Sequence, residues 1–163
     1  NNVYYLTQTT LSLDEANVII SALEQRFPNI QGPPAQDICY ATENRQQAIK
    51  RRADTSDLIL VVGSQNSSNS RRLVEVGVNA GTPGYLIDDE RDIDAQWLSG
   101  VRAVTITAGA SAPEVLVQRV IEHLRGQFDF NRVEEVEVIE ENVKFPLPKQ
   151  LAADHTRLTQ ISG

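Results

Sequence analysis

Hydrophobic and polar positions along the chain predict short buried strands that alternate with helices. Four apolar runs have the length of buried strands: residues 3–6, 58–62, 85–87 and 103–106. Helical spacing or helix-start signals lie between and after them: residues 12–27, 42–53, 71–80, 93–98 and 111–126. Strands that alternate with helices favour parallel pairing with right-handed crossovers. The sequence therefore predicts an α/β fold with a Rossmann-like parallel sheet and flanking helices.

A proline-rich stretch divides this pattern. Residues 29–37 include Gly32-Pro33-Pro34, which neither a helix nor a central strand tolerates, so we place a domain boundary there. Residues 1–36 then form a strand-loop-helix unit, and residues 37–127 form a complete α/β domain. Residues 128–163 are predicted to form an edge strand at 133–139, where apolar and acidic residues alternate, followed by an extended tail.

Helix starts are marked by capping signals. Ser12 and Ser111 each open an S-x-x-E pattern, which predicts capping boxes at the start of two helices. Thr42 is the predicted N-cap of the polar helix that runs to Ala53. The helix of residues 71–80 is predicted to begin after the polar run that precedes it.

Three polar loops each follow a predicted strand and precede a helix: Thr7–Thr10, Ser64–Ser70 and Thr107–Ser111. Loops in that position share the edge at the carboxyl ends of the strands, where α/β proteins bind ligands. Helix N-termini there offer N–H groups to an anion, and hydroxyls and amides complete its hydrogen bonds. The loops contain no Lys or Arg before Arg71, so we expect a neutral anion-binding site. The alternative is that these residues only form turns and N-caps.

The chain has one cysteine, Cys39, which lies three residues before Thr42. A single thiol excludes an internal disulfide and cannot complete a structural zinc site, and it favours a reducing compartment. A position near a helix N-terminus favours the thiolate. The alternative is a small buried apolar side chain, which is the common environment of an isolated cysteine. Spacing alone does not decide between these two interpretations.

Composition and charge narrow the possible partners. The 163-residue chain is 40% hydrophobic, enough to bury a core, and its formal net charge of -7 disfavours a nucleic-acid partner. No apolar run reaches the roughly 20 residues that span a bilayer, and no signal peptide opens the chain. We therefore expect a cytoplasmic protein without a membrane partner.

Other motifs carry little functional signal. The G-x-G-x-x-G and Walker fingerprints of dinucleotide and nucleotide sites are absent, as is the G-x-S-x-G elbow of hydrolases. The acidic residues at 88–94 could bind a divalent ion, but they lack EF-hand order, and we expect a solvated turn with acids at a helix start. His123 and His155 are expected to be solvated.

Several motifs in this order resemble one known family, the LytB/IspH reductases. They are Thr7-Gln8-Thr9-Thr10-Leu11-Ser12, Asp37-Ile38-Cys39-Tyr40-Ala41-Thr42, Asn44-Arg45-Gln46, Val61-Val62-Gly63-Ser64, Asn66-Ser67-Ser68-Asn69-Ser70 and Thr107-Ala108-Gly109-Ala110-Ser111-Ala112-Pro113. The resemblance extends nearly to the end of the chain, through Glu141-Asn142-Val143 and Phe145-Pro146-Leu147-Pro148. The combination is specific, because it spans all three polar loops and the cysteine.

This resemblance implies an activity, the last step of the non-mevalonate isoprenoid pathway. The family reductively dehydroxylates an allylic diphosphate to isopentenyl and dimethylallyl diphosphate, with a 4Fe-4S cluster for the redox step. A ferredoxin or flavodoxin supplies the electrons. By resemblance Cys39 is one of three cluster ligands, and Thr9, with Thr10 adjacent, lies near the substrate hydroxyl. The residues that match the diphosphate site are Ser67, Ser68, Asn69 and Ser111.

The resemblance also implies that this chain is one part of a larger protein. The family folds as three similar α/β domains around a cleft, so residues 1–36 would be the end of the domain preceding residues 37–127. The chain contains no methionine and opens on Asn1, which agrees with a preceding segment. The other two cluster cysteines, the substrate-facing histidines and the catalytic glutamate of the family have no counterpart here, and neither His123 nor His155 matches them.

Two rival interpretations remain at this level. One is a Rossmann-like module that binds a sugar phosphate or nucleotide through the same loops, with Cys39 buried and without a cluster. The other is an interaction subunit whose tail docks on another chain. Iron content and the sequence upstream of Asn1 separate both from the reductase.

The isolated chain should not assemble a stable cluster, because it supplies a single cysteine. Anaerobic reconstitution with iron and sulfide, followed by measurement of bound iron, tests this expectation. A full complement of four irons per chain, as a 4Fe-4S cluster contains, would contradict it.

Overall fold

The computed structural model describes residues 3–33 and 38–136, and its centre is a three-stranded parallel sheet. The strands are β1 (Leu58–Val62), β2 (Gly84–Ile87) and β3 (Val104–Ala108), in the order β2-β1-β3. Leu60 of β1 lies opposite Tyr85 of β2 and Ile106 of β3. Every residue of β1 is buried, which explains its uninterrupted apolar sequence. The predicted α/β class and parallel order are confirmed.

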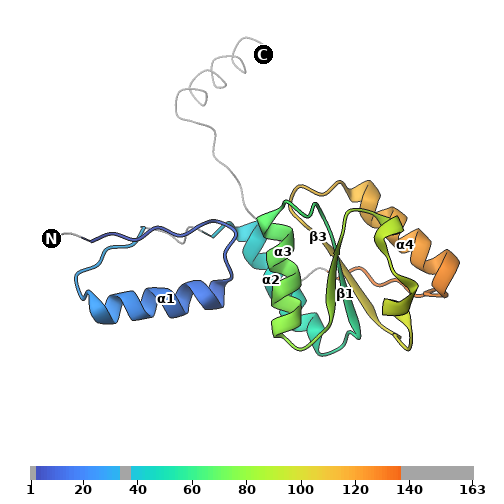
Figure 1. The fold of residues 1–163 in the computed structure, drawn as a ribbon, viewed down its shortest axis with the longest axis horizontal. Helices are drawn as coiled ribbons and strands as arrows, with labels where there is room; N and C mark the ends of the chain where they lie inside the picture. The colour runs from blue at the N-terminus through green and yellow to red at the C-terminus, as the bar shows by residue number, and fades with distance from the viewer. Residues whose placement is uncertain (1–2, 34–37, 137–163) are drawn as a thin grey trace, which may run out of the picture.

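Helices cover both faces of the sheet, as Figure 1 shows. On one face α2 (Tyr40–Ala53) and α3 (Ser68–Asn79) pack on β1 around Ile49, Ile59 and Leu73. On the other face α4 (Glu114–Phe128) packs around Leu60, Val120 and other buried apolar residues. Successive residues of β1 therefore supply two separate cores, one in front of the sheet and one behind it.

The unit of residues 3–33 lies beside this sheet domain and contains α1 (Leu13–Arg26). The predicted strand at residues 3–6 does not form: Tyr4 makes a single isolated parallel bridge with Gln31. A strand needs a neighbour along its length, and the described residues supply only this one bridge. The side chain of Gln46, fully buried in α2, joins the unit to the sheet domain by donating to the carbonyl oxygen of Leu11 at 2.9 Å.

Several predicted helix boundaries were wrong. The polar helix begins from Cys39, whose carbonyl oxygen accepts from the amides of Thr42 and Glu43, so Thr42 is a buried first-turn residue rather than the N-cap. The helix that follows β1 begins at Ser68 rather than at the predicted Arg71, because Ser67 caps it. The last three residues of the polar run therefore belong to its first turn. The two capping boxes predicted at Ser12 and Ser111 do not form, because neither helix has a side-chain cap. The helix α1 nevertheless begins where expected, directly after Ser12.

The last part of the domain also differs in detail. The final helix is capped at Pro113, two residues after Ser111, and it continues to Phe128. The predicted short helix at 93–98 is replaced by two 3-10 turns, η1 (Glu90–Asp92) and η2 (Ala95–Leu98). Residues 133–136 form no strand, and the rest of the predicted edge strand and tail lies outside the described residues. The domain boundaries themselves stay a prediction.

Asp57 lies directly before β1, at the amino-terminal edge of the sheet. Its carboxylate oxygen Oδ2 accepts hydrogen bonds from the backbone amides of Arg102 at 2.9 Å and Ala103 at 3.0 Å. These two bonds, with a smaller contribution from the Arg102 charge, lower the pKa of the Asp57 carboxyl below its usual 3.8. A single side chain thereby connects the starts of two neighbouring strands.

We expect Asp57→Asn to lower the melting temperature at pH 7, because the ionised form makes the stronger bonds. A lowered pKa in the folded chain adds stability that is complete above the unfolded value and is lost as the pH falls through the folded value. The gap between wild type and variant should therefore shrink as the pH falls below 3.8. Thermal unfolding from pH 7 to pH 2 measures it, with Asp54→Asn at the exposed end of α2 as control. A gap independent of pH would contradict this role.

Candidate anion site at the carboxyl edge of the sheet

Two of the predicted polar loops meet at the carboxyl ends of β1 and β3. The amide of Gly109 donates to the carbonyl oxygen of Val62 at 2.9 Å, so the residues that follow the two strands are hydrogen-bonded neighbours. The hydroxyl of Ser70, which is fully buried, fills the space beside both loops. A Cβ added to Gly63 would lie 2.3 Å from Ser70 Oγ, and one added to Gly109 would lie 2.2 Å from it. Only glycine permits this approach at either position.

The start of α3 places the serine and asparagine side chains at this edge. Ser67 is the N-cap, and its Oγ accepts from the Ser70 amide at 3.2 Å. Ser68 is exposed at the first position of the helix, whereas Asn69 is 8% exposed. The first turn of a helix carries backbone N–H groups that no residue of the same helix accepts, and the helix dipole favours an anion there. Most of the predicted diphosphate residues therefore lie in one helical turn.

The side-chain amide of Asn69 lacks hydrogen-bond partners. Both Oδ1 and Nδ2 are buried, and neither makes a hydrogen bond to any residue that the structure describes. An amide left in this state costs about 1–3 kcal/mol, so buried amides are nearly always paired. A Cβ at Gly109 would lie 3.9 Å from Nδ2, which places the amide against the neighbouring loop. A ligand with polar atoms at this edge would supply the partners.

The remaining predicted residues form a second group near the first. The amide of Cys39 donates to the carbonyl oxygen of Thr9 at 3.3 Å, so the first polar loop contacts the start of α2. Thr9 and the Cys39 thiol are exposed, and Thr10 is half-buried. The interpretation of Cys39 as a buried apolar side chain was therefore wrong. In Figure 1 α2 and α3 begin at the same end of the sheet domain, so both groups share that end.

Ser111 is exposed in the loop between β3 and α4, two residues beyond Gly109. Sequence reasoning named it with Ser67, Ser68 and Asn69, but it gave no role to Ser70, Gly63 or Gly109, which also stand in the motifs. A glycine directly after each of β1 and β3 is the signal that could have located the close approach.

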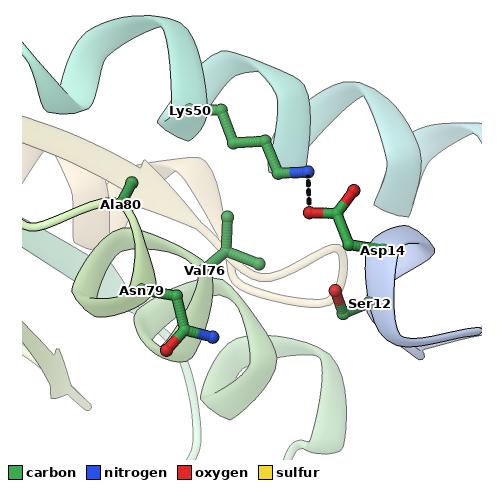
Figure 2. A pocket seen from close by; sticks show the side chains of 6 residues that line it. All are labelled: Ser12, Asp14, Lys50, Val76, Asn79 and Ala80. Carbon is green, nitrogen blue, oxygen red and sulfur yellow. Dashed lines mark hydrogen bonds and ion pairs between the residues drawn. The ribbon is translucent and has the colours of Figure 1, made fainter. Parts of the chain in front are cut away.

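Two cations of α2 and α3, Arg72 and Lys50, have acidic partners. The guanidinium of Arg72 pairs with Glu15 of α1 and with Glu75 of α3, both at 2.6 Å. A shallow cavity of about 250 Å³ at the junction of α1, α2 and α3 contains Lys50, but Figure 2 shows its ammonium directed to Asp14, which neutralises it. Hydroxyls, an amide and helix N–H groups thus lie together at this edge, and their role as an anion site stays a prediction.

The acidic turn does not form a metal site within the described residues, which contain no cluster of three candidate ligands. Asp89 and Asp94 instead cap the two 3-10 turns by accepting from the amides of Arg91 and Gln96. The hydrogen bond from the Arg91 side chain is the main reason that the pKa of Asp89 falls to about 2. Asp88, Asp92 and Asp94 are solvent-exposed as predicted, whereas Oε2 of Glu90 is buried and has no hydrogen-bond partner among the described residues.

A sequence model of the LytB protein family matches residues 1–125. The chain belongs to the LytB family. It is 53% identical over 158 residues to the 4-hydroxy-3-methylbut-2-enyl diphosphate reductase of Glaesserella parasuis, which covers 97% of this chain and 48% of that protein. It is 54% identical over 149 residues to the reductase of the same name from Pseudomonas aeruginosa, with 91% and 47% covered.

Solved structures agree with this assignment. The E-1-hydroxy-2-methyl-but-2-enyl-4-diphosphate reductase of Plasmodium falciparum superposes with a TM-score of 0.83 at 34% identity, over 97% of this chain and 50% of that one. The chain spans about half the length of the relatives that it matches. Among the described residues no helix is long and apolar enough to cross a membrane.

Replacing Asn69 by leucine should stabilise the ligand-free chain by about 1–3 kcal/mol, because a side chain of similar size without polar atoms removes the unpaired amide. Urea unfolding of wild type and Asn69→Leu measures the difference, and Asn66→Leu in the exposed loop is the control. A less stable Asn69→Leu chain would show that the amide already has its partners within the protein.

Proposed function

We propose that this chain is the part of a 4-hydroxy-3-methylbut-2-enyl diphosphate reductase that binds the substrate diphosphate and supplies one thiolate ligand of an iron-sulfur cluster. The observation that carries the proposal is the buried, unpaired amide of Asn69 at the start of α3, beside exposed hydroxyls and the exposed Cys39. The names of the relatives supply the substrate and the reaction.

The diphosphate would bind at the first turn of α3. Ser67 and Ser68 donate hydroxyl protons, Nδ2 of Asn69 donates from below, and Ser111 closes the site from the loop after β3. Phosphate oxygens accept all these bonds, and the helix dipole favours their charge. Because Arg72 and Lys50 are paired with carboxylates, neither of these two cations would serve as the main partner of the anion.

Thr9 and Thr10 would orient the allylic hydroxyl end of the substrate. The backbone contact between Thr9 and Cys39 sets this loop against the start of α2. Gln46 fixes the other end of the loop, since its side chain bonds to the backbone of both Leu11 and Leu13. In the proposed complex the hydroxyls of Thr9 and Thr10 would then lie between the diphosphate site and the cluster ligand.

Cys39 suits one ligand of a 4Fe-4S cluster and no more. Its thiol is exposed at the N-cap of α2, where an iron of a cluster could reach it. When bound, the cluster supplies the electrons for removal of the substrate hydroxyl. The other ligands and the catalytic acid must come from outside the described residues, so the proposed activity belongs to this chain together with the other half of its relatives.

The exposed apolar side chains of residues 3–33 are consistent with such a partner. Its apolar side chains are largely solvent-exposed: Leu6 is 82%, Val18 70%, Tyr4 63% and Ile19 58% exposed, while Ala16 is the buried residue of α1. Several large apolar side chains exposed within one short unit are consistent with an interface. We propose that the preceding half of the reductase covers it, and that a ferredoxin or flavodoxin donates the electrons to the assembled protein.

A chimera tests the proposal: the preceding half of the Glaesserella parasuis relative fused to this chain. We expect it to bind iron and, with dithionite, to convert 4-hydroxy-3-methylbut-2-enyl diphosphate into isopentenyl and dimethylallyl diphosphate. Cys39→Ser should abolish turnover but keep pyrophosphate binding, because the two sites use different groups. Ser99→Ala, at an exposed turn, is the matched control. A chimera with a complete cluster and no turnover, or turnover that survives Cys39→Ser, would contradict the proposal.

A further inference from the structure

Ser70 has a place in the site that neither the sequence motifs nor the comparisons assign. Its side chain is 1% exposed and lies below the exposed serines, at the point where the loops after β1 and β3 meet. Its Oγ donates to Ser67 Oγ at 3.0 Å, and its amide donates to the same oxygen at 3.2 Å. One buried residue thus directs two donors at a single half-buried hydroxyl.

This arrangement determines what Ser67 can do. A serine hydroxyl has two acceptor lone pairs and one proton. Ser70 occupies both lone pairs, so the O–H proton of Ser67 is left to donate, and two incoming hydrogen bonds polarise it. An oxygen that already accepts twice favours an acceptor as its next partner, and phosphate oxygens are acceptors.

We propose that Ser70 is a positioning residue that fixes the Ser67 hydroxyl as a hydrogen-bond donor to the phosphate group of the ligand. This rests on the proposed diphosphate site and adds the residue that orients it. Without the Ser70 hydroxyl, the proton of Ser67 can turn toward the protein interior. A lone pair of Ser67 Oγ can then face the anion and repel it.

The glycines after β1 and β3 support the same role. Ser70 Oγ occupies the space that a Cβ at Gly63 or Gly109 would need, so its rotamer is set by close contact with two loops. Any side chain at Gly109 would force the hydroxyl to rotate away from Ser67. The Cβ of Ser70 lies 3.5 Å from the same point, an ordinary contact, so an alanine at position 70 accommodates the added methyl group.

The test is a double-mutant cycle on inorganic pyrophosphate binding, measured by calorimetry on the chain. We expect Ser70→Ala to weaken binding by roughly 3-fold to 10-fold, the range for one lost hydrogen bond. In the Ser67→Ala background the same change should alter affinity by less than about 2-fold, because the hydroxyl that it orients is absent. A purely structural role of Ser70 would give the same loss in both backgrounds and would overturn the proposal.

Two further variants keep the conclusion independent of folding. Gly109→Ala should weaken binding as Ser70→Ala does, and the Gly109→Ala/Ser70→Ala pair should bind as Ser70→Ala alone. Thr82→Val removes another buried hydroxyl, which bonds to the carbonyl oxygen of Ala53 at 2.8 Å; it should lower the melting temperature and leave affinity unchanged.

A Ser70→Ala chain that does not fold would overturn the proposal, because a role in folding would then account for the hydroxyl. If wild type binds no pyrophosphate, the proposed function fails; if it binds and Ser70→Ala binds equally well, only the positioning role fails.

Discussion

Complete burial of β1 is the constraint on which the rest of the structure depends. Its five side chains alternate between two cores, one beneath α2 and α3 and one beneath α4. A strand fixed on both faces and hydrogen-bonded on both edges cannot shift its register, because a shift of one residue would exchange the two cores. The residues that follow Val62 and Ala108 therefore leave the sheet at defined neighbouring points, and the site is built from them.

In the proposed anion site, close approach of the loops would take the place of charge. Ser70 fits against two loops because both lack a Cβ at the contact, and this contact brings the start of α3 up against the turn after β3. The hydroxyl of Ser67 is thereby held in place before any ligand arrives. Donors that do not reorganise on binding hold an anion more effectively than mobile side chains of equal polarity.

The sequence was most informative where the pattern had a single physical explanation. The run of residues 58–62 could only be a buried strand, and strand-helix alternation then determined the parallel order. Helix starts were less predictable, since Ser, Thr and Asn suit a loop, an N-cap and a first turn equally well. Thr42 and Ser67 show this: the residue that caps the helix is decided by tertiary contacts. The expected strand at 3–6 required a neighbour that the described residues do not provide.

The site was likewise predictable in composition but not in detail. Position after a strand placed Ser67, Ser68, Asn69 and Ser111 at one edge, and family resemblance gave them and Cys39 a role that remains to be tested. Exposure of the thiol and burial of Asn69 could not be read from spacing, because each depends on which loops pack on the helix start. Ser70 was given no role because its contacts with Gly63 and with the distant Gly109 depend on how the loops after β1 and β3 pack together.

The unpaired amide of Asn69 links occupancy to folding. A ligand that satisfies it binds only the native chain, so by mass action the folded population grows with ligand concentration. Such a ligand would then protect the folded chain against unfolding and proteolysis. A locally unfavourable side chain would in this way make the lifetime of the chain depend on ligand concentration.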